Sequence, residues 1–355
     1  MPDLPIVSAD PRMCLTDKNP SLSRSGMIAL CFAGALLFCE IVTVQAEELA
    51  PHSRVEWAGV IESRGLNESS GLAASKRQQN VLWSMNDSGG NAELFALSTS
   101  GKHLGSWMLD MPKPSDWEAM TSFVWEQNPY LLVADIGDNF AVRGQVSYTI
   151  IPEPDIEKLA PDARLKPVQT QTFTYPDGPR DSEAIAVDAD QGEILIMSKR
   201  TKPIELYRLP LDLGRNSGPP RPTPDRVAEK ITSLNGLEKP DKAAADLYGD
   251  AWPFLAMPTG MSLHGNRLLV TTLEHALLYD RRNWAAPPQR IALPYIGQRE
   301  AITFAGDKGE VAYLTHEREY GMRHAHLLRL TLAPLSSCCA ELAKTGGSTA
   351  YPGDN

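Results

Sequence analysis

The residues best placed to do chemistry in this chain are acidic residues that recur in a short repeated pattern. The clearest copy is Arg180 to Ile185, which reads RDSEAI, and two further copies are Ser115 to Met120 (SDWEAM) and Gln298 to Ile302 (QREAI). Weaker copies are Glu68 to Leu72 (ESSGL) and Met257 to Met261 (MPTGM). In each copy a polar segment leads into a small residue and then a short apolar run. A unit repeated in this way predicts a repeat architecture, in which equivalent residues gather at one place.

Three uses of the repeated acids are consistent with their chemistry. Carboxylates from several repeats are the ligands of a hard cation such as Ca²⁺, which takes six to eight oxygens. The natural ligands for such an ion are Glu68, Glu118, Glu183 and Glu300, with Asp87 and Asp138 above them. Alternatively, Glu118 and Glu183 are a pair of carboxyls suited to general acid–base hydrolysis. In the third interpretation the acids pair with arginines and lock the repeats together.

The elements that must position these acids are short strands separated by turn residues. After Val55 to Ile61 come five units, each with strand-like apolar runs bounded by Gly, Pro, Asn or Asp. The fifth unit contains only three runs, so the first strand of the chain is available to complete it. We therefore predict an all-β fold, a β-propeller of five four-stranded blades whose ring is closed by the N-terminal strand.

A six-bladed ring is the alternative. The repeats start at Ser70, Glu118, Glu183, Thr259 and Glu300, at intervals of 48, 65, 76 and 41 residues. A four-stranded blade takes about 40–50 residues. The two long intervals therefore contain either insertions or a further degenerate blade.

In a propeller the innermost strands line a central channel, and the loops that lead into them open on one face together with the loops that follow the second strands. These loops contain polar residues that we expect to bind a ligand: Asn86, Asp87, Asp116, Trp117, Asp138, Asn139, Arg180, Asp181 and Arg299. The loops of the opposite face are plainer. The sequence thus predicts an acidic working face around one mouth of the channel.

The first 46 residues read as an export leader. Basic residues precede the apolar run Met27 to Cys39, and small residues end at Ala46, as at a signal-peptide cleavage site. We expect a periplasmic or secreted protein, with an uncleaved N-terminal membrane anchor or lipidation at Cys39 as alternatives. The propeller is predicted over residues 47–333, with a Pro-rich insertion at 214–248, and residues 334–355 are predicted to be a disordered tail.

Charge narrows the class of partner. The net charge of −10 argues against binding to nucleic acid, whose phosphates require a basic surface, and gives no reason to expect binding to anionic lipid. We expect a monomer that, once the leader is cleaved, does not bind membranes. Its ligand is expected to be a small molecule or a protein.

Several segments carry a resemblance to known propellers: Asn67 to Leu72, Leu82 to Gly89, Asp116 to Glu118, Asp135 to Asn139 and Tyr175 to Glu183. They resemble a family of exported bacterial β-propeller proteins, which implies the fold and export but no particular activity. More loosely, the acids are similar to those of the calcium-dependent nucleotidase (apyrase) propellers and of the gluconolactonase/regucalcin type. These resemblances imply a channel Ca²⁺, although Thr259 replaces the acid in the fourth copy.

Together these observations predict an exported propeller that binds a ligand or partner at the acidic mouth of its channel, with a channel Ca²⁺. The alternative is a hydrolase of phosphoesters, lactones or glycosides that uses the carboxylates at the channel mouth. The sequence does not decide between a binding protein and an enzyme.

Overall fold

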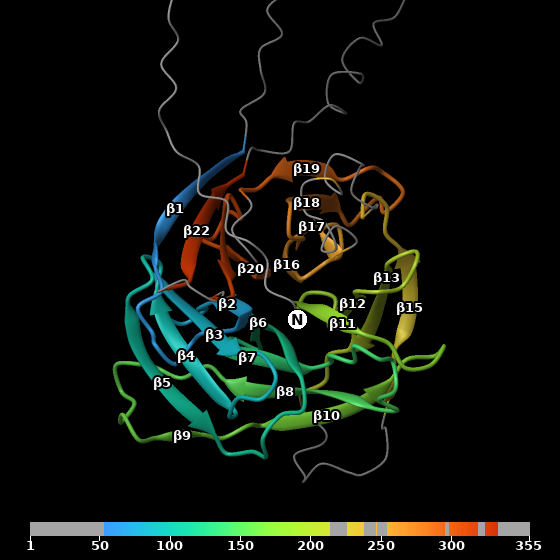
Figure 1. Ribbon diagram of the computed structural model, residues 1–355. Helices are drawn as coiled ribbons and strands as arrows, with labels where there is room; N and C mark the ends of the chain where they lie inside the picture. Colours follow the sequence, from blue (N-terminus) through green and yellow to red (C-terminus); the bar gives the residue numbers. More distant parts are fainter. Residues whose placement is uncertain are drawn as a thin grey trace, which may run out of the picture. The chain divides into compact units, whose positions relative to one another are not determined.

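The structure is a computed structural model, and it describes residues 53–213, 226–237, 246, 254–294, 298–318 and 324–332. These residues form a β-propeller (Figure 1). The predicted leader 1–46, the tail 334–355 and most of the insertion 214–248 lie outside the described residues. Among the residues that are described, no helix is long and apolar enough to span a membrane.

Five antiparallel sheets form the blades, and each sheet runs outward from an innermost strand. Blade 1 contains β2 (Ser69–Ala74), β3 (Val81–Asn86), β4 (Glu93–Ser98) and β5 (His103–Leu109). Blade 2 contains β6 (Trp117–Trp125), β7 (Asn128–Asp135), β8 (Val146–Pro152) and β10 (Gln169–Thr174). Blade 3 contains β11 (Ser182–Asp188), β12 (Glu193–Ser198), β13 (Glu205–Pro210) and β15 (Glu229–Ser233). Blade 4 contains β16 (Gly260–His264), β17 (Arg267–Thr271), β18 (His275–Asp280) and β19 (Gln289–Ala292).

Blade 5 is completed by the N-terminal strand. It contains β20 (Arg299–Ala305), β21 (Val311–His316), β22 (His326–Thr331) and, outermost, β1 (Arg54–Val60). β1 pairs antiparallel with β22, from Arg54 opposite Thr331 to Val60 opposite His326. The predicted ring of five blades closed by the first strand is therefore confirmed.

Two short strands were not predicted. β9 (Arg164–Leu165) pairs in parallel with the outer edge of blade 1, and β14 (Arg226–Val227) pairs in parallel with the outer edge of blade 2. Both belong to the long intervals of the repeat, so each interval reaches back and covers the edge of the preceding blade. Covering an edge strand removes unpaired backbone groups that would otherwise recruit another chain.

The core of the ring lies between neighbouring blades, in five clusters of buried apolar side chains. Successive side chains of a strand point to opposite faces of the sheet. In β6, accordingly, Met120 packs toward blade 1, whereas Ala119 and Phe123 pack toward blade 3. Each innermost strand also lies beside the innermost strands of both neighbouring blades. The side chains at the start of these strands are therefore held in one narrow space.

Candidate functional site

The innermost strands of four blades begin with the same irregularity. The pairing of the first strand with the second shifts by one residue at the start of β2, β6, β11 and β20. The residues left without a partner opposite are Ser70, Glu118, Glu183 and Glu300. A β-bulge of this kind redirects the side chain of its extra residue. In three blades the redirected residue is a glutamate, and all three glutamates are buried.

A second set of charged residues follows the second strand of three blades, blades 1, 3 and 5. Asp87, Lys199 and Glu317 are equivalent, because each donates its backbone N–H to the residue two positions before the bulge. The N···O distances are 3.0 Å from Asp87 to Glu68, 3.0 Å from Lys199 to Asp181 and 2.9 Å from Glu317 to Gln298. Blades 1 and 5 thus carry an acid at the position where blade 3 carries a lysine.

The ammonium of Lys199 lies among the carboxylates. It contacts the carboxylate of Glu183, and the side chains of the pair are 14% and 4% exposed. Burial works against the charge of Lys199, but Glu183, Glu300 and Glu118 outweigh it and hold its pKa above the usual range. An ammonium that is shared by several buried carboxylates stays charged at all physiological pH values.

The single positive charge of Lys199 does not neutralise all of these carboxylates, and the pKa values of the carboxyl groups are therefore raised. Burial, followed by the negative charges of Glu183 and Asp87, raises the pKa of Glu118 well above its usual range. Burial likewise raises the pKa of Glu183 to about 7, despite the opposing effect of Lys199. The pKa of Glu300 is also well above its usual range, because burial disfavours its charged form and Glu183, Glu317 and Asp87 add negative charge. Without a further cation, the channel favours protonated carboxyls.

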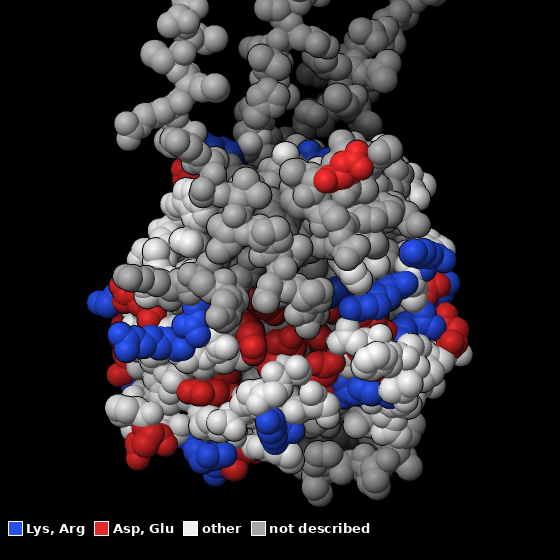
Figure 2. All heavy atoms as spheres, viewed as in Figure 1, with Lys and Arg blue, Asp and Glu red and all other residues white. Residues whose placement is uncertain are grey.

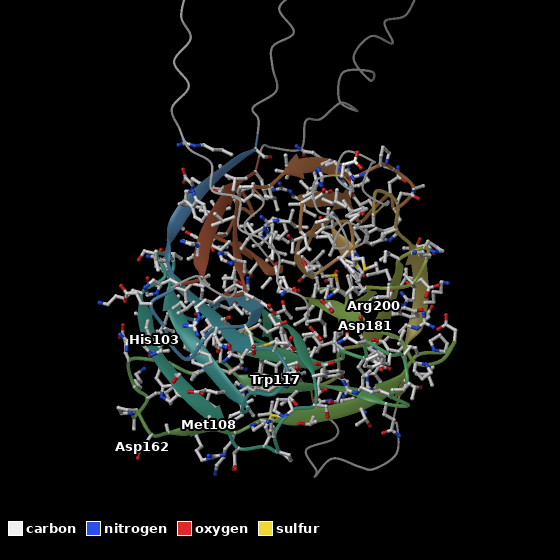
Figure 3. The ribbon with its side chains drawn as sticks, viewed as in Figure 1. His103, Met108, Trp117, Asp162, Asp181 and Arg200 are labelled. Atoms are coloured by element: carbon white, nitrogen blue, oxygen red, sulfur yellow. The ribbon has the colours of Figure 1, made fainter. Side chains whose placement is uncertain are left out.

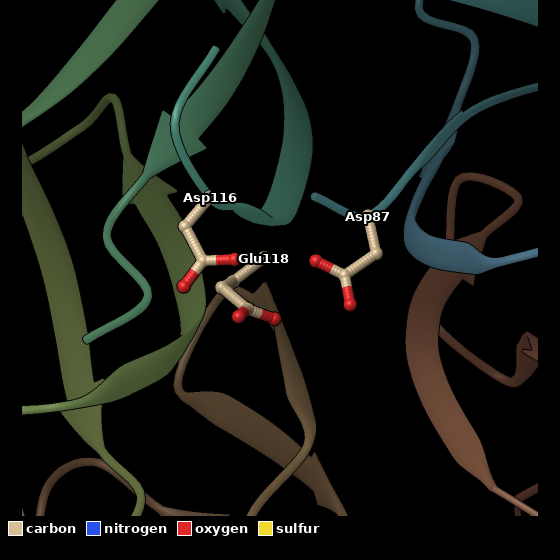
Figure 4. Close-up of side chains that lie close together, drawn as sticks. All are labelled: Asp87, Asp116 and Glu118. Atoms are coloured by element: carbon tan, nitrogen blue, oxygen red, sulfur yellow. The ribbon is translucent and has the colours of Figure 1, made fainter. Parts of the chain in front are cut away.

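Three of the acids converge on one point. A carboxylate oxygen from each of Asp87, Asp116 and Glu118 lies within 4.8 Å of the others (Figure 4). Gly137 makes this approach possible, because a Cβ atom there would lie 2.3 Å from Oδ2 of Asp116 and 2.4 Å from Oε1 of Glu118. Burial, and then the charge of Asp87, raises the pKa of Asp116 to about 6. In the space-filling view, acidic side chains gather in the middle of this face (Figure 2).

The predicted ligand-binding residues Asp138, Asn139 and Asp181 form a rim beside this cluster. Asp181 accepts a hydrogen bond from the backbone N–H of Asp138 at 2.9 Å and pairs with Arg200 (Figure 3). Arg200 also donates to Oδ1 of Asn139 at 2.6 Å. Asp138 in turn accepts the N–H groups of Val142 and Arg143, at 2.9 and 2.7 Å. The rim is thus built from two blades and held by charged hydrogen bonds.

Four residues predicted for the site have other contacts. Asn86 accepts the N–H groups of Asn67 and Glu68, and Trp117 is buried in the cluster between blades 1 and 2. The guanidinium of Arg180 pairs with Glu205 and with Asp177, at 2.6 Å from the latter, and lies over two tyrosine rings.

The guanidinium of Arg299 donates to backbone carbonyls of blade 4, among them that of Leu273 at 2.6 Å. Of the predicted metal ligands, Glu68 is exposed and precedes the bulge by two residues, where it adds negative charge near Glu317.

Sequence reasoning did not choose Lys199, Glu317 or Gly137 as site residues, although Lys199 and Glu317 fall in loops that it placed at this mouth. Burial and the charge of Asp87 raise the pKa of Glu317 to about 7, and Gln298 donates to its Oε2 at 3.0 Å. Lys199 and Glu317 could have been found from the sequence, because each directly follows the second strand of its blade, as Asp87 does. This shared position places the three residues at equivalent points around the channel mouth. Gly137 gave no such signal, because its role depends on side chains from another part of the blade.

The opposite end of the ring has a different character. A cavity of about 650 Å³ lies there, beside the last residues of β2 and β20. Its charged lining is mixed and includes Lys76, Arg77, Asp307 and Glu310. The concentration of buried carboxylates is found at the other mouth, which we therefore take as the candidate site.

No protein-family model matches the sequence, and no curated protein does. Among solved structures, the chain is similar to the PQQ-bound aldose sugar dehydrogenase of Streptomyces coelicolor, with 12% identity, a TM-score of 0.45 and coverage of 79% of this chain and 99% of that one. It is also similar to regucalcin, a calcium-binding protein of Agrobacterium tumefaciens, with 14% identity, a TM-score of 0.42 and coverage of 79% and 98%.

A luciferin-regenerating enzyme is similar as well, with 10% identity, a TM-score of 0.41 and coverage of 80% and 96%. Regucalcin is one of the propeller types that the sequence resembles. Because all three TM-scores are below 0.5, the assignment of the fold rests on the strand order described above.

Proposed function

We propose that the channel mouth binds a divalent cation, Ca²⁺ by preference, between Asp87, Asp116 and Glu118. The observation that supports this most directly is the separation of their oxygens. Two oxygens that each lie about 2.4 Å from one Ca²⁺ are at most about 4.8 Å apart, and the three carboxylates meet that limit. Their oxygens are hard ligands of the kind that Ca²⁺ prefers.

The ion anchors a ligand at the mouth. Three carboxylates supply fewer oxygens than the six to eight that Ca²⁺ takes, so positions remain for water and for oxygens of the ligand. The rim made by Asp138, Asn139, Asp181 and Arg200 lies next to these positions and offers both acceptors and a guanidinium. A small molecule or a protein segment with exposed oxygens fits this combination.

Metal analysis and melting curves test the proposal. Purified protein is expected to contain one Ca²⁺ per chain, and EDTA is expected to lower the melting temperature by several degrees, because an ion that binds only the folded state stabilises it. Glu118→Gln should remove most of the EDTA effect. Glu157→Gln, an exposed change in the loop after β8, is the matched control and should leave the effect intact. Protein without bound metal and without a response to EDTA would falsify the proposal.

Hydrolysis is the second candidate, and the raised pKa values of Glu118 and Glu183 favour it. A carboxyl that stays protonated near neutral pH is suited to act as a general acid, and an ionised neighbour as a general base. Turnover of a phosphoester, lactone or glycoside that is lost in both Glu118→Gln and Glu183→Gln supports this function. Equal turnover by wild type and both variants excludes it.

Export belongs to the same proposal. The leader predicted at residues 1–46 would deliver the propeller to the periplasm or the medium, where we propose that it acts as a monomer. N-terminal sequencing of the mature protein tests the cleavage after Ala46, and its size in solution tests the monomer.

A further inference from the structure

Among the described residues, Lys199 provides the ammonium that faces the channel glutamates. Its Nζ contacts the carboxylate of Glu183, and the charges of Glu300 and Glu118 act on it as well. This ammonium therefore lies where several carboxylates share one positive charge. That is also the arrangement in which proteins hold a metal cation.

The local backbone structure at residue 199 does not depend on a positively charged side chain. The equivalent residues after the second strands of blades 1 and 5 are Asp87 and Glu317, and all three make the same backbone hydrogen bond. A carboxylate side chain is therefore compatible with the backbone at this position. What differs in blade 3 is the charge of the side chain, not the local structure.

Glu300 shows that the negative charge of the channel carboxylates exceeds the single positive charge of Lys199. Glu300 is 7% exposed, and no hydrogen bond or ion pair to its carboxylate is found within the described part of the chain. Leaving a buried carboxylate without a partner is costly. Glu300 occupies the same bulge position in β20 as Glu183 does in β11, and the charges of Lys199 and Glu183 act on it, so it borders the same channel.

We propose that the channel has two cation positions, and that the ammonium of Lys199 permanently fills one of them. This inference rests on the proposed function for the other position, the one between Asp87, Asp116 and Glu118. Lys199 thereby limits the chain to a single divalent cation. The position that it fills is bordered by Glu183 and Glu300 and becomes a metal site when residue 199 is an acid.

The two occupants differ in what they offer to a ligand. A lysine ammonium is tethered and donates hydrogen bonds to the surrounding carboxylates, so it has no coordination position to share. A bound Ca²⁺ keeps positions for external oxygens. Filling one position with Lys199 therefore leaves a single ion able to contact the ligand, and fixes where the ligand's oxygens lie in the channel.

Calcium titration of Lys199→Glu tests this assignment. We measure the number of Ca²⁺ bound per chain by calorimetry and by metal analysis after dialysis. Wild type is expected to bind one ion and Lys199→Glu two. The matched control is Lys230→Glu in the same blade, which also removes a lysine that contacts a buried glutamate, Glu205. It changes the net charge equally and should still bind one ion.

The outcomes separate the two proposals. One ion in both wild type and Lys199→Glu overturns the second position and leaves the proposed function standing. No ion in wild type but one in Lys199→Glu contradicts the proposed function and supports the role of Lys199. No ion in either protein overturns both proposals.

The variant could also fail to fold in EDTA, because it adds a carboxylate to a crowded channel. In that case, refolding on addition of Ca²⁺ with two ions per chain supports the inference. Failure to refold in Ca²⁺ overturns it.

Discussion

Gly137 lets the proposed metal ligands approach one another because it has no side chain. A methyl group at this position would occupy the space in which the carboxylates of Asp116 and Glu118 meet. The residue contributes no ligand atom, and yet it decides whether two of the three proposed ligands can face the same ion. Residues that hold metal ligands in place typically affect affinity by roughly 10–100-fold.

Gly137→Ala is accordingly expected to weaken Ca²⁺ binding by roughly 10–100-fold and to leave the fold intact. Calorimetric titration measures the affinity, and circular dichroism checks the fold. Gly144→Ala is the control, because no atom beyond the adjacent residues lies within 4 Å of the Cβ position there. Equal affinities for the two variants would contradict the assigned role of Gly137.

A pH dependence follows from the raised pKa values. Burial raises the pKa of Glu317 to about 7 and that of Asp116 to about 6, whereas carboxyls of the unfolded chain titrate near about 4. Between about pH 4 and pH 7 the unfolded chain therefore holds fewer protons than the folded one, and the free energy of unfolding falls as the pH rises.

In EDTA the melting temperature should accordingly fall from about pH 4 to about pH 7, and less steeply in Glu317→Gln. Saturating Ca²⁺ should flatten the wild-type profile, because the ion stabilises the charged carboxylates. A wild-type profile in EDTA that rises over this range would show that the carboxyls are not buried as described.

At the scale of the element, the repeated bulge directs one side chain at the start of an innermost strand into the channel. Without the extra residue, the side chain would follow the alternation of the strand and enter the core between two blades. The bulge places Glu118, Glu183 and Glu300 on the channel instead. In blade 4 no such shift occurs at the start of β16, and the residue before that strand is Thr259.

The loop after β7 depends on Asp138, whose carboxylate accepts the N–H groups of Val142 and Arg143. Asp138→Ala should lower the free energy of unfolding by about 2–3 kcal/mol, because hydrogen bonds to a charged group are lost. Urea unfolding measures the change, and hydrogen exchange should show faster exchange of these two amides. Asp190→Ala, at an exposed turn, serves as the control. Unchanged exchange at Val142 and Arg143 would exclude this role of Asp138.

The blades and their inner strands could be predicted from the sequence because each has a local signal, an apolar run bounded by turn residues. β9 and β14 could not, because strands of two residues have no periodicity and their pairing is set by a distant blade edge. The sequence places acids in the loops at this mouth, but it does not show which of Glu68 and Asp87 faces the channel. Which acid of a loop faces the channel depends on the bulge, and the bulge becomes visible only in the register of the strands.

At the scale of the molecule, the ring closes through β1. Arg329 donates to Oε1 of Glu56 at 2.8 Å across 273 residues of sequence. β1 also lies tightly against blade 1, since a Cβ at Gly59 would be 1.9 Å from the carbonyl oxygen of Ser100. β1 is thus held in the last blade by pairing and against the first blade by packing.

Gly59→Val should therefore push β1 away from blade 1 and lower the free energy of unfolding by about 1–3 kcal/mol, as overpacking typically does. Thermal unfolding measures the loss, and size-exclusion chromatography should show association through the exposed edge of β22. Gly144→Val, at an open position, is the control. A variant as stable as this control would show that the close contact of β1 with blade 1 is dispensable.

The pairing of β1 with β22 also sets the order of events during folding. The strand made first can find its partner only after the final blade has been synthesised, and closing so long a loop is slow. Until then we expect the innermost strands not to enclose a complete channel. Asp87 and Glu118, which come from neighbouring blades, are then not held at their final separation. Ca²⁺ binding is thus expected to appear with the last kinetic phase of refolding. It would report that β1 has paired with β22 and that the ring of blades has closed.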